Sequence, residues 1–88
     1  MDDRITCEPL EDKTGCIGVC FTILKPEHDR KYILVWKPGG KWYGKVRFPD
    51  ASITMPEAKA IFLREKFGLD EYAERQYALY TDNLPAND

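Results

Sequence analysis

Hydrophobic side chains recur at every second position in residues 16–25, and a helical period begins after residues 49–50. In residues 16–25 the alternation predicts a strand with one buried face, formed by Ile17, Val19, Phe21 and Ile23. Residues 31–37 and 41–48 are rich in β-branched and aromatic side chains and predict two further strands. The Pro-Gly-Gly sequence between these two segments predicts that they form a hairpin.

The two faces of this hairpin follow from its register, in which we expect Trp36 to face Trp42. One face then carries six mainly apolar side chains: Tyr32, Leu34, Trp36, Trp42, Val46 and Phe48. The other face carries cations with apolar and aromatic side chains between them: Lys31, Ile33, Val35, Lys37, Lys41, Tyr43, Lys45 and Arg47. A slip of one residue would scramble this assignment, so the cationic surface depends on the register.

The sequence after residue 53 predicts two helices. Residues 54–57, Thr-Met-Pro-Glu, match a capping box, in which the Thr and Glu side chains bond to amide groups at the helix start. Gly68 predicts the end of this helix, because glycine readily takes the left-handed conformation that follows a last helical turn. Asp70 predicts the cap of a second helix that continues to about Tyr80.

The first helix carries two apolar stripes, so we expect it to lie between the sheet and the second helix. The stripes are Met55, Ala58, Ile61 and Phe62 on one side, and Ala60, Leu63 and Phe67 on the other. The second helix carries a single stripe of Leu69, Ala73, Tyr77 and Tyr80. Together these elements predict an α+β fold of the order β-β-β-α-α, a three-stranded antiparallel sheet followed by two helices packed on one face.

The chain is long enough for one hydrophobic core. It has 88 residues, of which 43% are hydrophobic and 32% are charged, as in globular proteins. We therefore expect a single small domain over residues 1–88. Within it we expect a loose or edge-strand lead-in at 1–14, the antiparallel sheet at 15–48, the helical pair at 53–81 and a tail at 82–88.

The N-terminus and the cysteines do not indicate export. The acidic N-terminus is not followed by the apolar segment of a secretory signal, and the apolar runs are too short to cross a bilayer. Cys16 and Cys20 would lie about 13 Å apart on one strand, whereas the Cα atoms of a disulfide lie about 4.4–6.8 Å apart. With Cys7 they make an odd number. We therefore expect reduced thiols, a cytoplasmic location and no membrane contact.

Candidates for catalysis and metal binding are few. Cys20, His28 and Asp29 would be the nucleophile, base and orienting group, but His28 lies in a polar turn, which is typical of a solvated histidine. Cys16 and Cys20 have no second pair of ligands for a zinc site. Ser52 precedes a helix and indicates a cap. We therefore expect a non-enzymatic protein with no catalytic residue, no metal and no cofactor.

The net charge of −2 conceals an uneven distribution. Residues 1–24 hold two bases and five acids, residues 25–48 hold seven bases and two acids, and residues 49–88 hold four bases and eight acids. The hairpin region therefore carries a net charge of +5 between two acidic segments. The total argues against a uniformly basic nucleic-acid-binding protein, whereas the middle segment has the charge of a local basic surface.

Part of the hairpin and the start of the first helix resemble a known family. Residues 40–46, which begin Gly-Lys-Trp, and residues 54–58, Thr-x-x-Glu-Ala, resemble the small three-stranded DNA-binding domains at the start of many phage integrases. That family reads DNA with the face of its sheet. Its pattern places another strand between the Trp and the Glu-Ala pair, where this sequence predicts a short loop, so no site residue is carried over.

Two classes of function fit these features. The first is a non-enzymatic protein that occupies a surface of a larger host protein or nucleoprotein complex, as a phage-type inhibitor of a host defence system such as an anti-CRISPR protein does. The second is a nucleic-acid-binding module that uses the basic face of the 31–47 hairpin. Lysines that only keep the sheet soluble are the third interpretation. The sequence leaves the oligomeric state open.

The predicted partner-binding residues are the hairpin cations and two tyrosines, because Tyr is enriched among residues that carry binding energy at interfaces. They are Lys31, Lys37, Lys41, Tyr43, Lys45, Arg47 and Tyr72. Tyr72 and Leu79 lie at the borders of the second helix's apolar stripe, so both are predicted to make exposed contacts.

Overall fold

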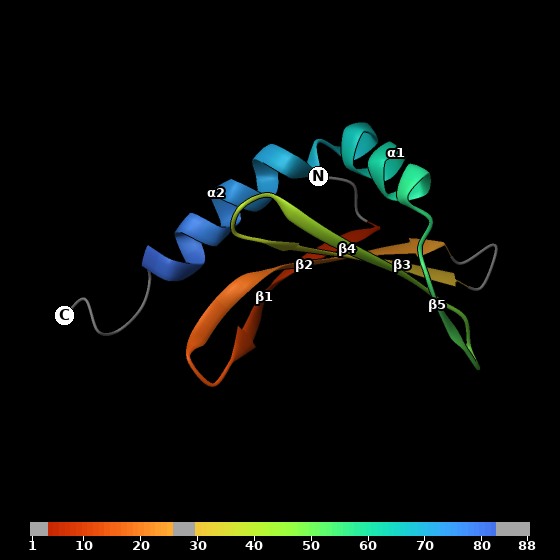
Figure 1. The fold of residues 1–88 in the computed structure, drawn as a ribbon, viewed down its shortest axis with the longest axis horizontal. Coiled ribbons are helices and arrows are strands. Elements are labelled where there is room, and N and C mark those ends of the chain that lie inside the picture. Colours follow the sequence, from red (N-terminus) through yellow and green to blue (C-terminus); the bar gives the residue numbers. More distant parts are fainter. Residues whose placement is uncertain (1–3, 26–29, 83–88) are drawn as a thin grey trace.

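The computed structural model describes residues 4–25 and 30–82, and residues 1–3, 26–29 and 83–88 lie outside the described part. It shows a five-stranded antiparallel sheet with two helices on one face (Figure 1). The α+β class, the antiparallel sheet and the two C-terminal helices are confirmed, whereas the prediction of three strands is wrong. The elements are β1 (Ile5–Asp12), β2 (Gly15–Lys25), β3 (Arg30–Lys37), β4 (Lys41–Arg47), β5 (Ser52–Thr54), α1 (Glu57–Phe67) and α2 (Leu69–Asp82).

The N-terminal segment forms an edge strand of the sheet, whose strands lie in the order β1-β2-β3-β4-β5. β1 pairs with β2, and it contributes the buried Ile5 and the half-buried Cys7 to the core. The Asp12 carboxylate accepts hydrogen bonds from the Thr14 amide at 2.7 Å and the Thr14 hydroxyl at 2.6 Å, which fixes the turn into β2. Residues 5–12 thus form an edge strand, and residues 1–3 lie outside the described part.

A fifth strand precedes the helices, where the sequence predicted a loop and a capping box. β5 pairs with residues 45–47 of β4 and so extends the sheet. α1 then begins after Pro56, its N-cap residue, and no side chain bonds to the helix start. The capping box that starts at Thr54 and the capping role of Ser52 are therefore wrong, because the backbone of both residues is in the sheet.

The core lies between the sheet and the helices. The hairpin register is the predicted one, with Trp36 opposite Trp42. Gly44 leaves room above β4, since a Cβ there would lie 3.0 Å from the Met55 Cβ and 3.3 Å from the Leu34 Cδ2. The buried hydrophobic residues are Ile5, Val19, Phe21, Ile23, Tyr32, Leu34, Trp36, Val46, Met55, Leu63, Leu69 and Ala73.

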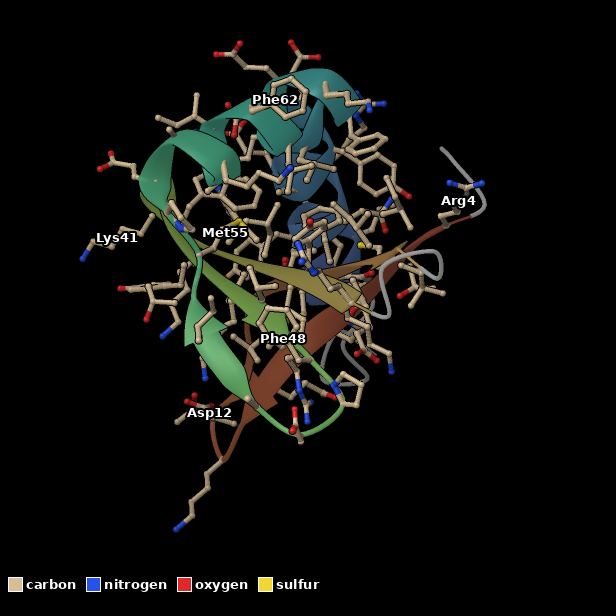
Figure 2. All side chains as sticks on the ribbon, turned by 90° about the vertical axis from the view of Figure 1, so that its right-hand side faces the viewer. Arg4, Asp12, Lys41, Phe48, Met55 and Phe62 are labelled. Carbon is tan, nitrogen blue, oxygen red and sulfur yellow. The ribbon has the colours of Figure 1, made fainter. Side chains whose placement is uncertain are left out.

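The first helix does not lie between the sheet and the second helix. Both helices cover the same face of the sheet and follow one another along the long axis of the molecule (Figure 1). α2 packs over β2 and buries Leu69 and Ala73, whereas α1 buries only Leu63. The prediction that both stripes of α1 are buried is wrong, because Ile61 is 40% and Phe62 55% exposed, although Met55 is buried. Figure 2 shows Phe62 on α1, away from the sheet.

The junction between the helices ties both of them to the sheet. Gly68 ends α1 as predicted, in the left-handed conformation with φ 62° and ψ 37°. α2 begins at once, so Asp70 lies in its first turn instead of capping it. Asp70 accepts hydrogen bonds from Arg64 at 3.0 Å and 3.3 Å, and the Arg64 guanidinium lies 4.9 Å from the centre of the Trp42 ring. The predicted stripe of α2 is confirmed, since its four residues lie in the core or against it: Leu69, Ala73, Tyr77 and Tyr80.

Candidate partner-binding surface

The face of the sheet opposite the helices is not covered by any described element (Figure 1). The hairpin that forms its centre turns at Gly39 and Gly40, whose φ angles of 95° and 76° favour glycine. Because Trp36 and Trp42 both face the helices, the residues that alternate with them on β3 and β4 face outward. The predicted register therefore leads to the predicted outward face.

Six of the seven predicted site residues lie together on this open face. We call this group the cationic face and define it as Lys31, Lys37, Lys41, Lys45 and Arg47 with Tyr43. Within it, Lys31 pairs with Arg47 and Lys37 pairs with Lys41 across the two strands. In the described part of the chain, no carboxylate forms an ion pair with any of these five cations. The cationic face thus brings like charges together without an ion pair. The Asp12 carboxylate, whose pKa is lowered mainly by its hydrogen bonds with Thr14, nevertheless lies near enough to Lys37 for that charge to contribute to the lowered pKa.

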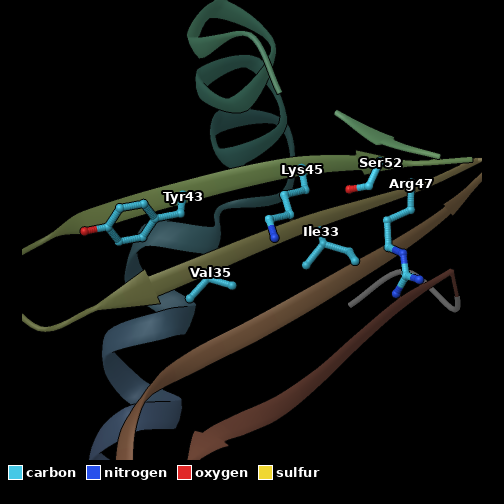
Figure 3. Close-up of a pocket in the computed structure, with 6 residues that line it drawn as sticks. All are labelled: Ile33, Val35, Tyr43, Lys45, Arg47 and Ser52. Carbon is cyan, nitrogen blue, oxygen red and sulfur yellow. The ribbon is translucent and has the colours of Figure 1, made fainter. Parts of the chain in front are cut away.

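An open depression of about 430 Å³ lies in the cationic face (Figure 3). It is lined by Ile33, Val35, Tyr43, Lys45, Arg47 and Ser52. Ile33 and Val35 are half-buried, so the depression joins an apolar strip to flanking cations. The predicted register placed these two residues on this face, but not in the site. Ser52 was missed because a lone serine before a helix resembles a cap, and nothing in three residues signals a strand.

The ring of Tyr43 is held by a neighbouring cation. The Lys37 ammonium lies 5.3 Å from the centre of the ring, within the range of a cation–π contact. The Tyr43 side chain nevertheless stays 54% exposed. The structure therefore presents an oriented aromatic ring at the centre of the cationic face.

An acidic residue borders the cationic face on the side of β1. Glu8 pairs with Cys20, which pairs in turn with the outward residue Val35, so the Glu8 carboxylate shares the open face. Burial raises the pKa of the Cys20 thiol, and the charge of Glu8 raises this pKa further. The thiol therefore holds its proton at neutral pH, which disfavours it as a nucleophile. His28 and Asp29, its suggested partners, lie outside the described residues.

The seventh predicted site residue lies on the other side of the sheet. Tyr72 is half-buried on α2, and its ring centre lies 5.9 Å from that of Phe21 in the core. Leu79 on the same helix is 50% exposed, as predicted. The structure does not bring Tyr72 together with the cationic face, and its role in partner binding stays a prediction.

The described residues contain neither a metal-binding cluster nor a membrane-spanning helix. Among residues 4–25 and 30–82, no three His, Cys, Asp or Glu side chains are grouped so that they could hold a metal ion. Within the same residues, no helix is both long and apolar enough to cross a membrane. Comparison with protein-family models, with curated proteins and with solved structures finds no match for the chain. The fold and the surface define a small α+β protein with an open cationic sheet face, and the resemblance to phage integrase domains stays a prediction.

Proposed function

We propose that this protein is a non-enzymatic binding protein that docks its cationic face on an anionic surface of a larger protein or nucleoprotein complex. The proposal rests on the two cross-strand pairs of like charge, Lys31 with Arg47 and Lys37 with Lys41. Like charges directly opposite one another destabilise a sheet. An anionic partner would relieve this repulsion on binding, so a feature that costs stability in the free protein would contribute to affinity.

Protection against aggregation explains these cations less well. Lysines serve that purpose on edge strands, where backbone groups are unpaired. β3 lies between β2 and β4, and residues 45–47 of β4 pair with β5. Lys31, Lys45 and Arg47 therefore lie on backbone that is paired on both sides, whereas Lys41 lies on the part of β4 that β5 does not cover. Edge protection can explain the charge of Lys41 but not the charges of the other three.

The specific form that we propose is a cytoplasmic inhibitor of a host defence system, of the kind that phages encode as anti-CRISPR proteins. Its support is the small size of the chain and the concentration of charge on one face, which suit the occupation of a surface and need no reaction centre. Phage or defence genes beside the coding sequence are the expected observation. A conserved neighbourhood of housekeeping genes would contradict this form without touching the binding proposal.

A reconstituted complex tests the binding proposal. A partner captured from the native host, identified and purified, should form a complex with the wild-type chain that the double variant Lys41→Glu/Lys45→Glu loses. Both lysines are exposed, so the variant should keep its circular dichroism spectrum and unfold no more easily than the wild type, since Glu at position 41 would face Lys37. The matched control is Lys13→Glu/Arg75→Glu, which reverses two exposed cations outside the cationic face. A complex that survives reversal at Lys41 and Lys45 would overturn the proposal.

A further inference from the structure

The cationic face repeats two kinds of chemistry along the strand direction. On β3 the outward residues run from Lys31 through Ile33 and Val35 to Lys37, with about 6.6 Å between successive members. A ligand that lies along β3 thus meets a cation, two apolar side chains and a second cation. It must therefore offer negative charge and flat apolar groups within the same short length.

The neighbouring strand also carries a cation at each end, with an aromatic residue and a further cation between them. On β4 the outward residues run from Lys41 through Tyr43 to Lys45 and Arg47. Lys41 and Arg47 continue the two cationic ends of β3, whereas the exposed Tyr43 ring lies beside Val35 in the apolar part. The two strands together form one surface with cations at both ends. Between these ends lie Ile33, Val35 and Tyr43, with one further cation at Lys45 opposite Ile33.

Single-stranded nucleic acid combines the required groups in every repeat. Each nucleotide has one phosphate, and each base has a π-face that stacks on aromatic side chains whatever its sequence. A duplex keeps its bases stacked inside, so it would use the cations and leave Ile33, Val35 and Tyr43 without contacts. The apolar strip therefore favours a single strand over a duplex.

The acidic border indicates how such a strand would lie. Glu8 occupies the open face on the far side of β2, where it repels a polyanion. A strand that crossed the sheet from β5 to β1 would meet this carboxylate. A strand parallel to β3 and β4 stays among the cations for about 20 Å, the length from Lys31 to Lys37.

The geometry points to single-stranded nucleic acid as the ligand of the cationic face, with the strand along β3 and β4, its phosphates on the cations and a base on Tyr43. This inference rests on the proposed function, because it names the anionic partner of the same surface. The acidic segment of a protein is the competing occupant, and the experiment below separates the two.

Fluorescence anisotropy with labelled single-stranded oligonucleotides and the matching duplex tests the inference. The single strand should bind more tightly, and with four or five phosphates engaged its affinity should fall roughly 50- to 130-fold between about 50 and 200 mM salt. Lys45→Ala should reduce the slope of log affinity against log salt by about 0.7. Arg75→Ala, an exposed cation on α2, is the matched control and should leave the slope unchanged.

The aromatic contact has its own pair of variants. Tyr43→Ala should weaken single-strand binding roughly 5- to 150-fold, the range for loss of one stacked base. Tyr43→Phe keeps the ring and should bind as the wild type does. A duplex that binds as tightly as the single strand, or Tyr43→Ala binding without loss, would overturn the inference and leave only non-specific attraction.

Failure of this inference is distinguishable from failure of the proposed function. If oligonucleotides do not bind but a poly-glutamate peptide does, and Lys41→Glu/Lys45→Glu abolishes that binding, the ligand is an acidic protein segment. The inference is then wrong while the proposed function stands. If neither polyanion binds and the partner complex survives the same reversal, both are wrong.

Discussion

The thiol of Cys7 and the hydroxyl of Tyr80 lie 3.4 Å apart and connect the edge strand β1 to the end of α2. The two residues are separated by 73 positions in the sequence, so this contact joins the sheet to the helical layer. The pKa of each group is raised mainly by burial. The hydrogen bond with Cys7 raises the pKa of the Tyr80 hydroxyl further. Both groups are therefore neutral in the folded protein at pH 7.

The fold should lose stability in alkaline solution. A group whose pKa is higher in the folded state than in the unfolded chain contributes its full stability below the unfolded pKa, and this contribution is lost as the pH rises beyond it. The ordinary pKa values are 9.0 for the Cys7 thiol and 10.0 for the Tyr80 hydroxyl. Urea unfolding should therefore give a lower free energy of unfolding above these values than near neutrality.

Tyr80→Phe isolates the part that the hydroxyl plays. The variant keeps the ring and removes the ionisable group, so the loss of stability at alkaline pH should be smaller than in the wild type. At neutral pH the lost hydrogen bond should cost about 0.5–1.5 kcal/mol. Tyr43→Phe, which removes a hydroxyl from an exposed ring, is the control. An alkaline loss that Tyr80→Phe leaves unchanged would show that this contact does not cause it.

Adjacent residues of α1 should respond to truncation in opposite ways. Leu63 is 2% exposed, so Leu63→Ala should cost about 2–5 kcal/mol of the free energy of unfolding. Phe62→Ala removes a larger side chain that lies mostly in solvent, so it should change stability by at most about 0.5 kcal/mol. Urea denaturation of both variants measures the difference. The reverse order would mean that α1 buries the stripe that contains Phe62.

Gly18 should not tolerate a side chain. A Cβ at this position would overlap the backbone carbonyl oxygen of Trp36 on β3, and backbone moves less readily than a side-chain end. Gly18→Ala should therefore lower the free energy of unfolding by about 1–3 kcal/mol. Ser52→Ala, a small change at an exposed position, is the comparison in the same urea titration. Equal midpoints for the two variants would contradict the close approach of β2 and β3.

The hairpin could be predicted in detail because its signals are local and agree with one another. Gly39 and Gly40 supply the turn, and the alternation on both sides of it leaves one register that buries Trp36 and Trp42 together. The position of the cations on the open face follows from that register. The common face of six of the predicted site residues could therefore be predicted from the sequence, and their role in binding stays a prediction.

The two strands beyond the predicted three are defined by their pairing, which the sequence pattern does not show. An edge strand was only one of two forms expected for residues 1–14, and no strand was expected at residues 52–54. β1 contains Pro9 and four acidic or polar residues, and its core contribution rests on Ile5 and Cys7 alone. β5 has three residues, all exposed. The prediction of the orientation of α1 was wrong for a related reason. When a helix has two apolar stripes, the sequence does not indicate which stripe the sheet will cover. Ser52 was not predicted to line the depression because β5, on which it lies, was not predicted.

Charge reversal at Lys31 should stabilise the sheet and weaken partner binding at the same time. Lys31 lies opposite Arg47, so Lys31→Glu replaces a like-charge pair by an opposite one, a gain of about 0.2–1 kcal/mol. Both side chains are exposed, so the gain should shrink in about 1 M salt, where the screening length is about 3 Å. Urea unfolding at low and high salt measures this gain.

The double variant Lys31→Glu/Arg47→Glu is the matched control for this prediction. It restores a pair of like charges with the opposite sign, so it should lose the stability gained by Lys31→Glu while binding an anionic partner even less well. Stability and binding would then depend on charge in different ways, as expected if the cations are kept for a ligand. If Lys31→Glu is no more stable than the wild type at low salt, the pair is not under repulsion, and the observation that carries the proposed function is lost.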